Sequence, residues 1–435
     1  MKKVFGKIRD VWNAVDIRKK LLFTAFILLI YRLGCAIPVP YVGSNIMDSF
    51  KQFYGGTIFE YMNLLSGGSL SQATLFALSV SPYITATIVI QLLTVAFKKL
   101  QDWSKDEEGK KKINVITRLL TVGLAVVTAY AYFRILKTNG WLIRDDLFAG
   151  IIIVTSFSAG AAIIMWLGEK INERGIGNGI SMILFANIIA SGPSIFFSVI
   201  GLLKQWPVWT IVGIVGIIFA CAIVVFIVWV TNSERRISVN YAKKVVGRKM
   251  YGGQNTNLPL KLNVSGVMPI IFASSIVSLP ATIGTLLGKS AESKGFWGVF
   301  MKIFDATSIL YVVLFIVLTV AFSYFYIMIS FDPVEVSNNL KKNGGAVPGI
   351  RPGQPTADYI KKVLNRVTLI GAIFLIIVAG LPMIINCIAN MFEVTNLSGI
   401  AFGGSSLLIV IGVALETARD IEAQMTMRHY KGFLQ

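Results

Sequence analysis

The sequence is short of the residues that most catalytic sites need. Its 435 residues include one histidine, His429, and only 14% of them are charged. With a single histidine, the chain offers no Ser-His-Asp triad and no histidine metal cluster. The three cysteines, Cys35, Cys221 and Cys387, lie in apolar stretches without paired spacing, which argues against a disulfide framework or a zinc site. We therefore expect no catalytic residues, no metal and no cofactor.

Apolar residues are what the sequence has in abundance. Hydrophobic residues make up 55% of the chain and the mean hydropathy is +0.70, a composition that water-soluble folds of this length do not normally have. A helix needs roughly 20 apolar residues to cross the hydrocarbon core of a bilayer. Such stretches predict ten spans, near residues 21–37, 74–97, 115–136, 150–168, 179–202, 209–231, 264–288, 308–330, 367–390 and 400–418. The predicted fold class is an all-α membrane protein.

Lysine and arginine are unevenly distributed between the two sides of these spans. The N-terminal side carries 31 of the 41, the opposite side carries 7, and three lie within spans. Because Lys and Arg beside spans are retained in the cytoplasm, both termini are predicted to be cytoplasmic. Few charges fall at mid-membrane depth, where proton-coupled carriers and voltage sensors usually need ionisable groups.

The N-terminal segment 1–20 predicts an amphipathic helix on an anionic membrane surface. Apolar residues recur at helical spacing among its basic ones: Val4, Ile8, Val11 and Val15. We interpret residues 21–37 as a retained first span. A lipoprotein signal requires an apolar residue at the position that Arg32 occupies. The later spans also contradict a cleaved, secreted product.

Two predicted cytoplasmic loops, residues 231–263 and 331–366, are long and basic. Glycine and proline turns interrupt the second loop. Loops of this length with their own turn chemistry are typical of docking surfaces, although the basic residues would also serve as orientation signals on solvated loops. The candidate docking residues are Arg235, Arg236, Lys243, Lys244, Arg248, Lys249, Lys341, Lys342, Arg351 and Arg366.

A short apolar run between Thr57 and Leu65 is too short to cross a membrane, and Ser66-Gly67-Gly68-Ser69 follows it. At membrane depth such a piece must be surrounded by protein or by a water-filled cavity. Periodicity alone favours an interfacial helix on the external surface.

Five long stretches resemble, in order, the SecY/Sec61-alpha family of protein-translocation channels, and together they cover most of the chain. Weaker stretches fall in predicted external loops, residues 137–150 and 289–306. The similar stretches are YMNLLSGGSLSQATLFALSVSPYITATIVIQLL from Tyr61, MWLGEKINERGIGNGISMILFANI from Met165, ERRISVNYAKKVVGRKMYGGQNTNLPLKLNVSGVMPIIFASSI from Glu234, DPVEVSNNLKKNGGAVPGIRPGQPTADYIKKVLNRVTLIGA from Asp332 and FGGSSLLIVIGVALE from Phe402.

The resemblance implies two inverted pseudo-symmetric five-helix halves, residues 21–202 and 203–418, around a central hourglass pore, with a cytoplasmic tail at 419–435. It implies an apolar ring at the waist of the pore, formed by Val80, Ile84, Ile180, Leu184, Ile271 and Ile409. A plug half-helix, near residues 57–70, would include Tyr61, Met62, Asn63, Leu64, Leu65, Ser66, Gly67 and Gly68. A lateral gate between the second and seventh spans would include Ser81, Thr85, Thr87, Gln91, Asn263, Ser274 and Ser275.

The implied function is a passive channel in the bacterial plasma membrane that passes unfolded preproteins and releases transmembrane segments into lipid. The implied partners are the SecE and SecG subunits, the SecA ATPase or the ribosome, the signal sequences of preproteins, and membrane lipids. Three other functions remain open from the residues themselves. A secondary transporter also uses inverted repeats, an intramembrane hydrolase could use serine and lysine, and an auxiliary insertase would lack the ring-bearing motifs.

Overall fold

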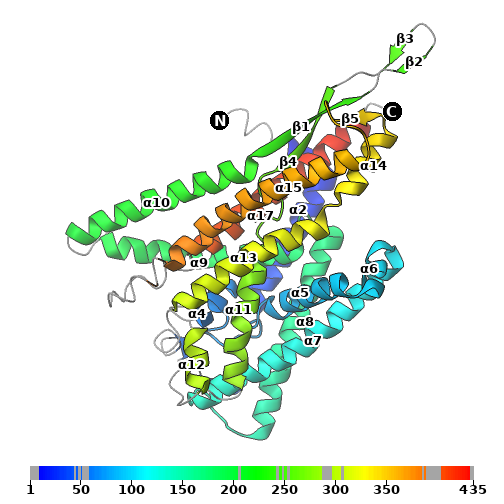
Figure 1. Ribbon diagram of the computed structural model, residues 1–435. Coiled ribbons are helices and arrows are strands. Elements are labelled where there is room, and N and C mark those ends of the chain that lie inside the picture. The colour runs from blue at the N-terminus through cyan, green and yellow to red at the C-terminus, as the bar shows by residue number, and fades with distance from the viewer. Residues whose placement is uncertain are drawn as a thin grey trace.

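The computed structural model describes residues 9–43, 46–47, 50, 58–203, 207–241, 244–246, 249–251, 255–286, 296–304, 308–384, 387 and 403–431. Helices dominate this part of the chain (Figure 1). The first half contains α2 (Val15–Gly34), α4 (Ile58–Leu65), α5 (Ser81–Ala96), α6 (Lys98–Lys105), α7 (Glu107–Thr138), α8 (Leu147–Arg174) and α9 (Gly179–Leu203). The second half contains α10 (Pro207–Asn232), α11 (Met268–Leu286), α12 (Phe296–Ile303), α13 (Ile309–Ser330), α14 (Pro333–Lys342), α15 (Gln354–Leu375), η1 (Ile376–Gly380) and α17 (Gly403–Lys431).

A helix coincides with each of the ten predicted spans. These helices are α2, α5, α7, α8, α9, α10, α11, α13, α15 and α17. Within the described residues, four segments are long and apolar enough to cross a membrane: Glu107–Thr138, Leu147–Arg174, Ile309–Lys342 and Gln354–Ile384. Helices α5 and α6 meet at a bend of 107° and would make a fifth segment if counted together.

The predicted start of the second span, at residue 74, is wrong. Residues 66–80 form turns, with Ala73 and Ser79 at positive φ, and the helix begins only at Ser81. Pro82 stands in its first turn, where proline is tolerated because no helical carbonyl is available to an N–H there. Hydropathy could not locate this boundary, since residues 74–80 are as apolar as the helix that follows.

Two later boundaries also differ from the prediction. Helix α15 begins at Gln354, inside the predicted second loop, and α17 continues to Lys431, past the predicted end at residue 418. Hydropathy marks only the part of a helix that faces lipid, whereas the backbone hydrogen bonding continues into the aqueous turns on either side.

The two basic loops have secondary structure of their own. Helix α14 occupies the start of the second loop, where the Asp332 carboxylate accepts from Val334 N at 2.8 Å and caps the helix. The first loop forms β1 (Glu234–Tyr241), β2 (Lys244–Val246), β3 (Lys249–Tyr251) and β4 (Asn255–Lys261), and the second adds β5 (Gly345–Ala346).

These strands join the two loops into one unit (residues 233–262 and 331–366), which we call the cytoplasmic unit after its predicted side of the membrane. β1 pairs antiparallel with β4 from Glu234↔Lys261 to Asn240↔Asn255, and with β5 through Tyr241↔Gly345. A small apolar core beneath the sheet contains buried residues from both loops: Ile237, Leu260, Val347, Ile360 and Leu364. Two loops that α11, α12 and α13 separate in the sequence therefore share one core.

The largest apolar cluster, which we call the central cluster, lies among the long helices and includes buried residues from α2, α5, α8, α9, α10, α11, α13, α15 and α17. A second cluster lies between α7, α8 and the turns at 66–80. A third joins Ala14 and Ile17 to Ile176, against Ile421 and Met425 near the end of α17. In Figure 1 the strands lie at the same end of the molecule as the carboxyl end of α17, as the predicted orientation requires.

Candidate functional site

The six predicted ring residues meet in the central cluster. Val80, Ile84, Leu184, Ile271 and Ile409 are all buried members of it, and Ile180 is partly buried against it. They come from the start of α5, from α9, from α11 and from α17, so segments far apart in the sequence converge here. Part of the Ile180 side chain covers α8, where a Cβ built on Gly168 would lie 2.6 Å from Ile180 Cδ1.

The predicted plug is a short helix followed by a tight return. Helix α4 has eight residues, about 12 Å of helix, which is too short to cross a membrane. It packs on α9, and Leu64 and Leu65 contact the central cluster. Gly67 and Gly68 turn the chain with φ of 65° and 88°, which glycine adopts without steric cost. The side chain of Tyr61 lies outside the described part of the structure.

A buried amide on α9, which the sequence reasoning did not single out, donates a hydrogen bond to the last residue of α4. Asn187 is fully buried, and its Nδ2 donates to Leu65 O at 2.7 Å and to Tyr31 Oη at 2.8 Å. Arg32 Nη2 donates to Ala186 O at 2.6 Å, one residue away. Polar residues within apolar spans are functional candidates in membrane proteins, and this signal could have identified Arg32 and Asn187.

An aromatic contact, which we call the aromatic wedge (Phe76 against Tyr31), fixes the chain between α4 and α5. The Phe76 ring stacks on Tyr31, with the ring centroids 5.4 Å apart and the planes 7° apart. Gly34 makes room for this ring, because a Cβ there would lie 2.0 Å from Phe76 Cε2. The Tyr132 hydroxyl donates to Leu70 O, which ties the same segment to α7.

The predicted gate helices α5 and α11 pack against each other. Ser81 and Gln91 are partly buried on α5, and Ser275 is partly buried on α11. Three gate hydroxyls bond to carbonyls of their own helix: Thr85 to Ser81 O at 3.1 Å, Thr87 to Tyr83 O at 2.9 Å and Ser274 to Ile271 O at 2.9 Å. Each of these three hydroxyls therefore donates its hydrogen bond within its own helix, and not across the contact between α5 and α11.

Asn263 does not lie on α11. It precedes the helix, is 8% exposed, and accepts at its Oδ1 from Ser265 Oγ at 3.4 Å. Its Cα is 3.8 Å from a Cβ built on Gly371, so its described neighbours include α15. The assignment of Asn263 to the gate stays a prediction.

The predicted docking residues spread over the cytoplasmic unit. Arg235 and Arg236 are exposed on β1, and Arg236 Nε lies 2.7 Å from Glu234 Oε1. Lys244 and Lys249 lie in the paired strands β2 and β3, whereas Lys243 and Arg248 lie outside the described residues. The four predicted docking residues of the second loop are all exposed: Lys341, Lys342, Arg351 and Arg366. The β1–β5 pairing thus places basic residues of both loops on one unit.

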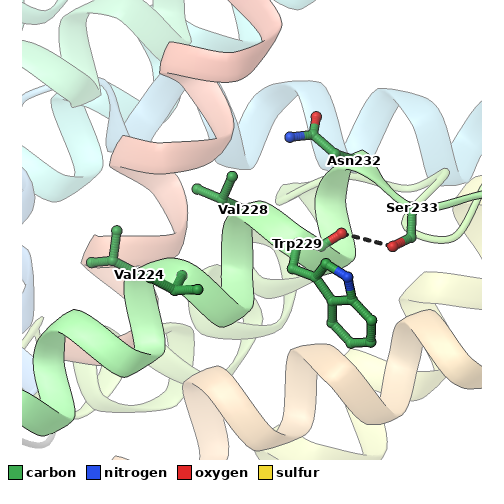
Figure 2. A pocket seen from close by; sticks show the side chains of 6 residues that line it. Val224, Val228, Trp229, Asn232 and Ser233 are labelled. Atoms are coloured by element: carbon green, nitrogen blue, oxygen red, sulfur yellow. Dashed lines mark hydrogen bonds between the residues drawn. The ribbon is translucent and has the colours of Figure 1, made fainter.

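A hollow along α10 lies outside the predicted site (Figure 2). Its lining residues are Val224, Val225, Val228, Trp229, Asn232 and Ser233, none of which belongs to the predicted ring, plug or gate. Ser233 Oγ donates to Trp229 O at 2.7 Å. Val225 and Trp229 are more than two-thirds exposed, at 68% and 69%, which is typical of side chains that face lipid near an interface.

Comparisons with known proteins match nearly the whole chain. The SecY family model matches residues 74–418. The protein translocase subunit SecY of Mycobacterium tuberculosis (strain ATCC 25618 / H37Rv) is 41% identical over 97% of this chain and 98% of that protein. The protein of the same name from Streptomyces scabiei is 40% identical over 97% of each chain.

Solved structures share the fold at lower sequence identity. The chain is similar to one described as a protein conducting channel, with a TM-score of 0.66, 18% identity, and coverage of 94% of this chain and 92% of that one. It is also similar to Sec61 in the canine ribosome-channel complex, with a TM-score of 0.64, 18% identity and the same coverage. The predicted helical membrane fold is confirmed.

Proposed function

Because the chain belongs to the SecY family, we propose that it is the channel-forming subunit of a protein translocase. It passes unfolded preproteins across the bacterial plasma membrane and releases transmembrane segments into lipid. It performs no catalysis itself, and a partner ATPase or the ribosome supplies the energy. The name of its relatives, protein translocase subunit SecY, supports this proposal.

The observation that carries the proposal is the convergence of the six ring residues on the central cluster. Four helices, two from each half of the chain, contribute apolar side chains to it. A narrow apolar neck dewets and so blocks ions, yet it offers a passing polypeptide no strong contact. Leu64 and Leu65 of the plug pack on the same cluster and close the path further.

The proposed architecture has an amphipathic N-terminal helix at 1–20, one half at 21–202, a second half at 203–418 and a tail at 419–435. Ten helices and the excess of Lys and Arg on one side support a multi-pass protein with both termini in the cytoplasm. The seam between α5 and α11 serves as the lateral gate. Its helices hold each other by packing, which a hydrophobic signal helix can replace when it enters from the pore.

The cytoplasmic unit is the proposed docking surface for SecA or the ribosome. Its exposed arginines can bind carboxylates or RNA phosphates through paired hydrogen bonds. Two similar structures come from ribosome-bound complexes, canine Sec61 and yeast Ssh1. SecE and SecG are the proposed membrane partners.

Crosslinking from the ring tests the channel. Cys35, Cys221 and Cys387 are first replaced, and single cysteines are then placed at Ile84, Ile180 or Ile271. A secretory chain stalled in transit, with one cysteine of its own, is treated with a short thiol crosslinker. Each ring cysteine should crosslink to the stalled chain, because the polypeptide has to pass between these side chains.

The matched control is Ile153→Cys on α8, an isoleucine that is fully buried but belongs to the cluster between α7, α8 and the turns at 66–80. It should give no crosslink. A translocase that exports the chain but never crosslinks at Ile84, Ile180 or Ile271 would rule out the pore assignment.

A further inference from the structure

We propose that Asn187 is the latch that holds the plug (α4 and residues 66–70) in the closed channel, an inference that rests on the function proposed above. It is a positioning residue, because it contacts the plug rather than the passing polypeptide. Its amide joins three parts of the chain: the end of α4, helix α2 and the turn before α5.

The latch acts at the carboxyl end of α4, where carbonyl groups lack donors from the helix itself. Leu65, the last residue of α4, has its carbonyl oxygen 2.7 Å from Asn187 Nδ2. Ser79 Oγ donates to the same oxygen at 3.3 Å. The last carbonyl of α4 therefore accepts two hydrogen bonds from outside the plug, one from a residue on α9 and one from a residue just before α5.

Arg32 and Gly67 define the space into which the latch fits. Arg32 Nη2 donates to Ala186 O at 2.6 Å and to Asn187 O at 3.4 Å, which ties α9 to α2 at the level of the plug. A Cβ built on Gly67 would lie 2.9 Å from Arg32 Nη1 and 3.1 Å from Asn187 Oδ1. Gly67 also has φ of 65°, so a glycine is needed for the plug to seat this closely.

The hydrogen bonding of Asn187 suits reversible release. Its donor side is satisfied by Leu65 and Tyr31, whereas Oδ1 has no partner among the described residues. A buried amide with an unpaired oxygen is poorly stabilised. When the plug leaves and water enters, the amide and the Leu65 carbonyl can both bond to water. The closed state thus keeps only a modest advantage, which an entering polypeptide can overcome.

The test compares the wild type with Asn187→Leu, a substitution that keeps the approximate volume and removes the hydrogen bonds. The assembled translocase is reconstituted in phospholipid vesicles, and resting ion flux is measured without any preprotein. We expect the flux to rise about five- to tenfold, the equivalent of about one net hydrogen bond. Ser79→Ala removes the weaker donor and should raise the flux less, which guards against misfolding of the first variant.

A second readout follows the plug directly. Ser69 is 2% exposed and its Oγ has no partner among the described residues, so Ser69→Cys is a nearly silent probe. In a background without Cys35, Cys221 and Cys387, this thiol should react with an impermeant maleimide faster when Asn187→Leu is present. The rate should rise by the same factor as the ion flux, because both report the open fraction.

The control is Thr319→Val, which removes another fully buried hydroxyl, one that donates to Phe315 O within α13. It should change neither readout. Suppose that wild-type vesicles translocate a preprotein, but Asn187→Leu increases neither the resting ion flux nor the rate of maleimide labelling. The proposed role of Asn187 is then refuted, while the proposed channel function is not. If wild-type vesicles export nothing, the proposed function fails and the latch fails with it.

Discussion

Replacing Gly34 by alanine should loosen the chain between the plug and α5. A Cβ at this position would lie 2.0 Å from Phe76 Cε2, 2.6 Å from Cζ and 2.7 Å from Cδ2. Carbon atoms at optimal separation are about 3.5–4.0 Å apart, so the ring has to move by more than 1 Å. Phe76 is 3% exposed and stacked on Tyr31, which leaves it little room to do so.

The magnitude follows from the cost of adding atoms to a packed core. Overpacking of this kind typically costs about 1–3 kcal/mol. If the strain is relieved when residues 66–80 open locally, the ratio of open to closed segment rises about 5- to 150-fold, since each 1.4 kcal/mol is tenfold. The upper part of this range applies if the stack on Tyr31 is lost as well, because an aromatic pair contributes about 0.5–1.5 kcal/mol.

Maleimide labelling of Ser69→Cys measures this local opening in Gly34→Ala and in its parent. Phe76→Leu lacks Cε2 and Cζ, the two ring atoms nearest to the new Cβ, so adding it to Gly34→Ala should restore protection in part. The double-mutant cycle should give a coupling of about 0.5–3 kcal/mol, as expected for residues in contact. Labelling of Gly34→Ala at the parental rate, or strictly additive effects of the two substitutions, would show that the wedge does not exist.

Substitutions at four further residues test the cytoplasmic unit and the contact between α10 and α17. Reversing charge at Arg236 and Arg351 should impair SecA-dependent or ribosome-bound export while membrane insertion continues; unchanged export would remove these residues from the docking surface. Leu364→Ala should cost about 2–5 kcal/mol of local stability, because Leu364 is 2% exposed in the core shared by the two loops. Limited proteolysis should then cut both loops faster, and cleavage of only one would contradict a common core. Arg419→Ala removes the hydrogen bonds that Arg419 Nη2 donates to Thr231 O at 3.0 Å and to Asn232 Oδ1 at 2.9 Å. Amide exchange at the carboxyl end of α10 should therefore accelerate, and unchanged exchange would show that these bonds do not stabilise that end of the helix.

The plug shows how far local sequence reasoning reaches. The apolar run from 58 to 65 is too short to cross a membrane, and α4 is indeed an eight-residue helix. The return after it, at Gly67 and Gly68, was implied by the family resemblance, and both glycines have positive φ. The role of Asn187 could not be read in the same way. Its partners, Tyr31 and Leu65, are 156 and 122 residues distant in the sequence.

The cytoplasmic loops show the same limit. Charge and turn residues indicated two separate basic surfaces, and strands were not expected in either. The structure joins them through Tyr241↔Gly345 and a common core, because short strands without enough apolar surface of their own must share it with another segment. No periodicity within either loop reports which segment that will be.

The sequence by itself determined the helical membrane class, because hydrophobicity acts residue by residue against lipid and water. It also predicted ten spans and their orientation from apolar runs and from the distribution of Lys and Arg. It also supplied the motifs that place the chain in the SecY family. Only the tertiary structure decided where α5 begins, how the two basic loops pair, and which polar groups contact the end of α4. Those features depend on contacts between distant segments, whose free energy is set by fit and by hydrogen-bond geometry.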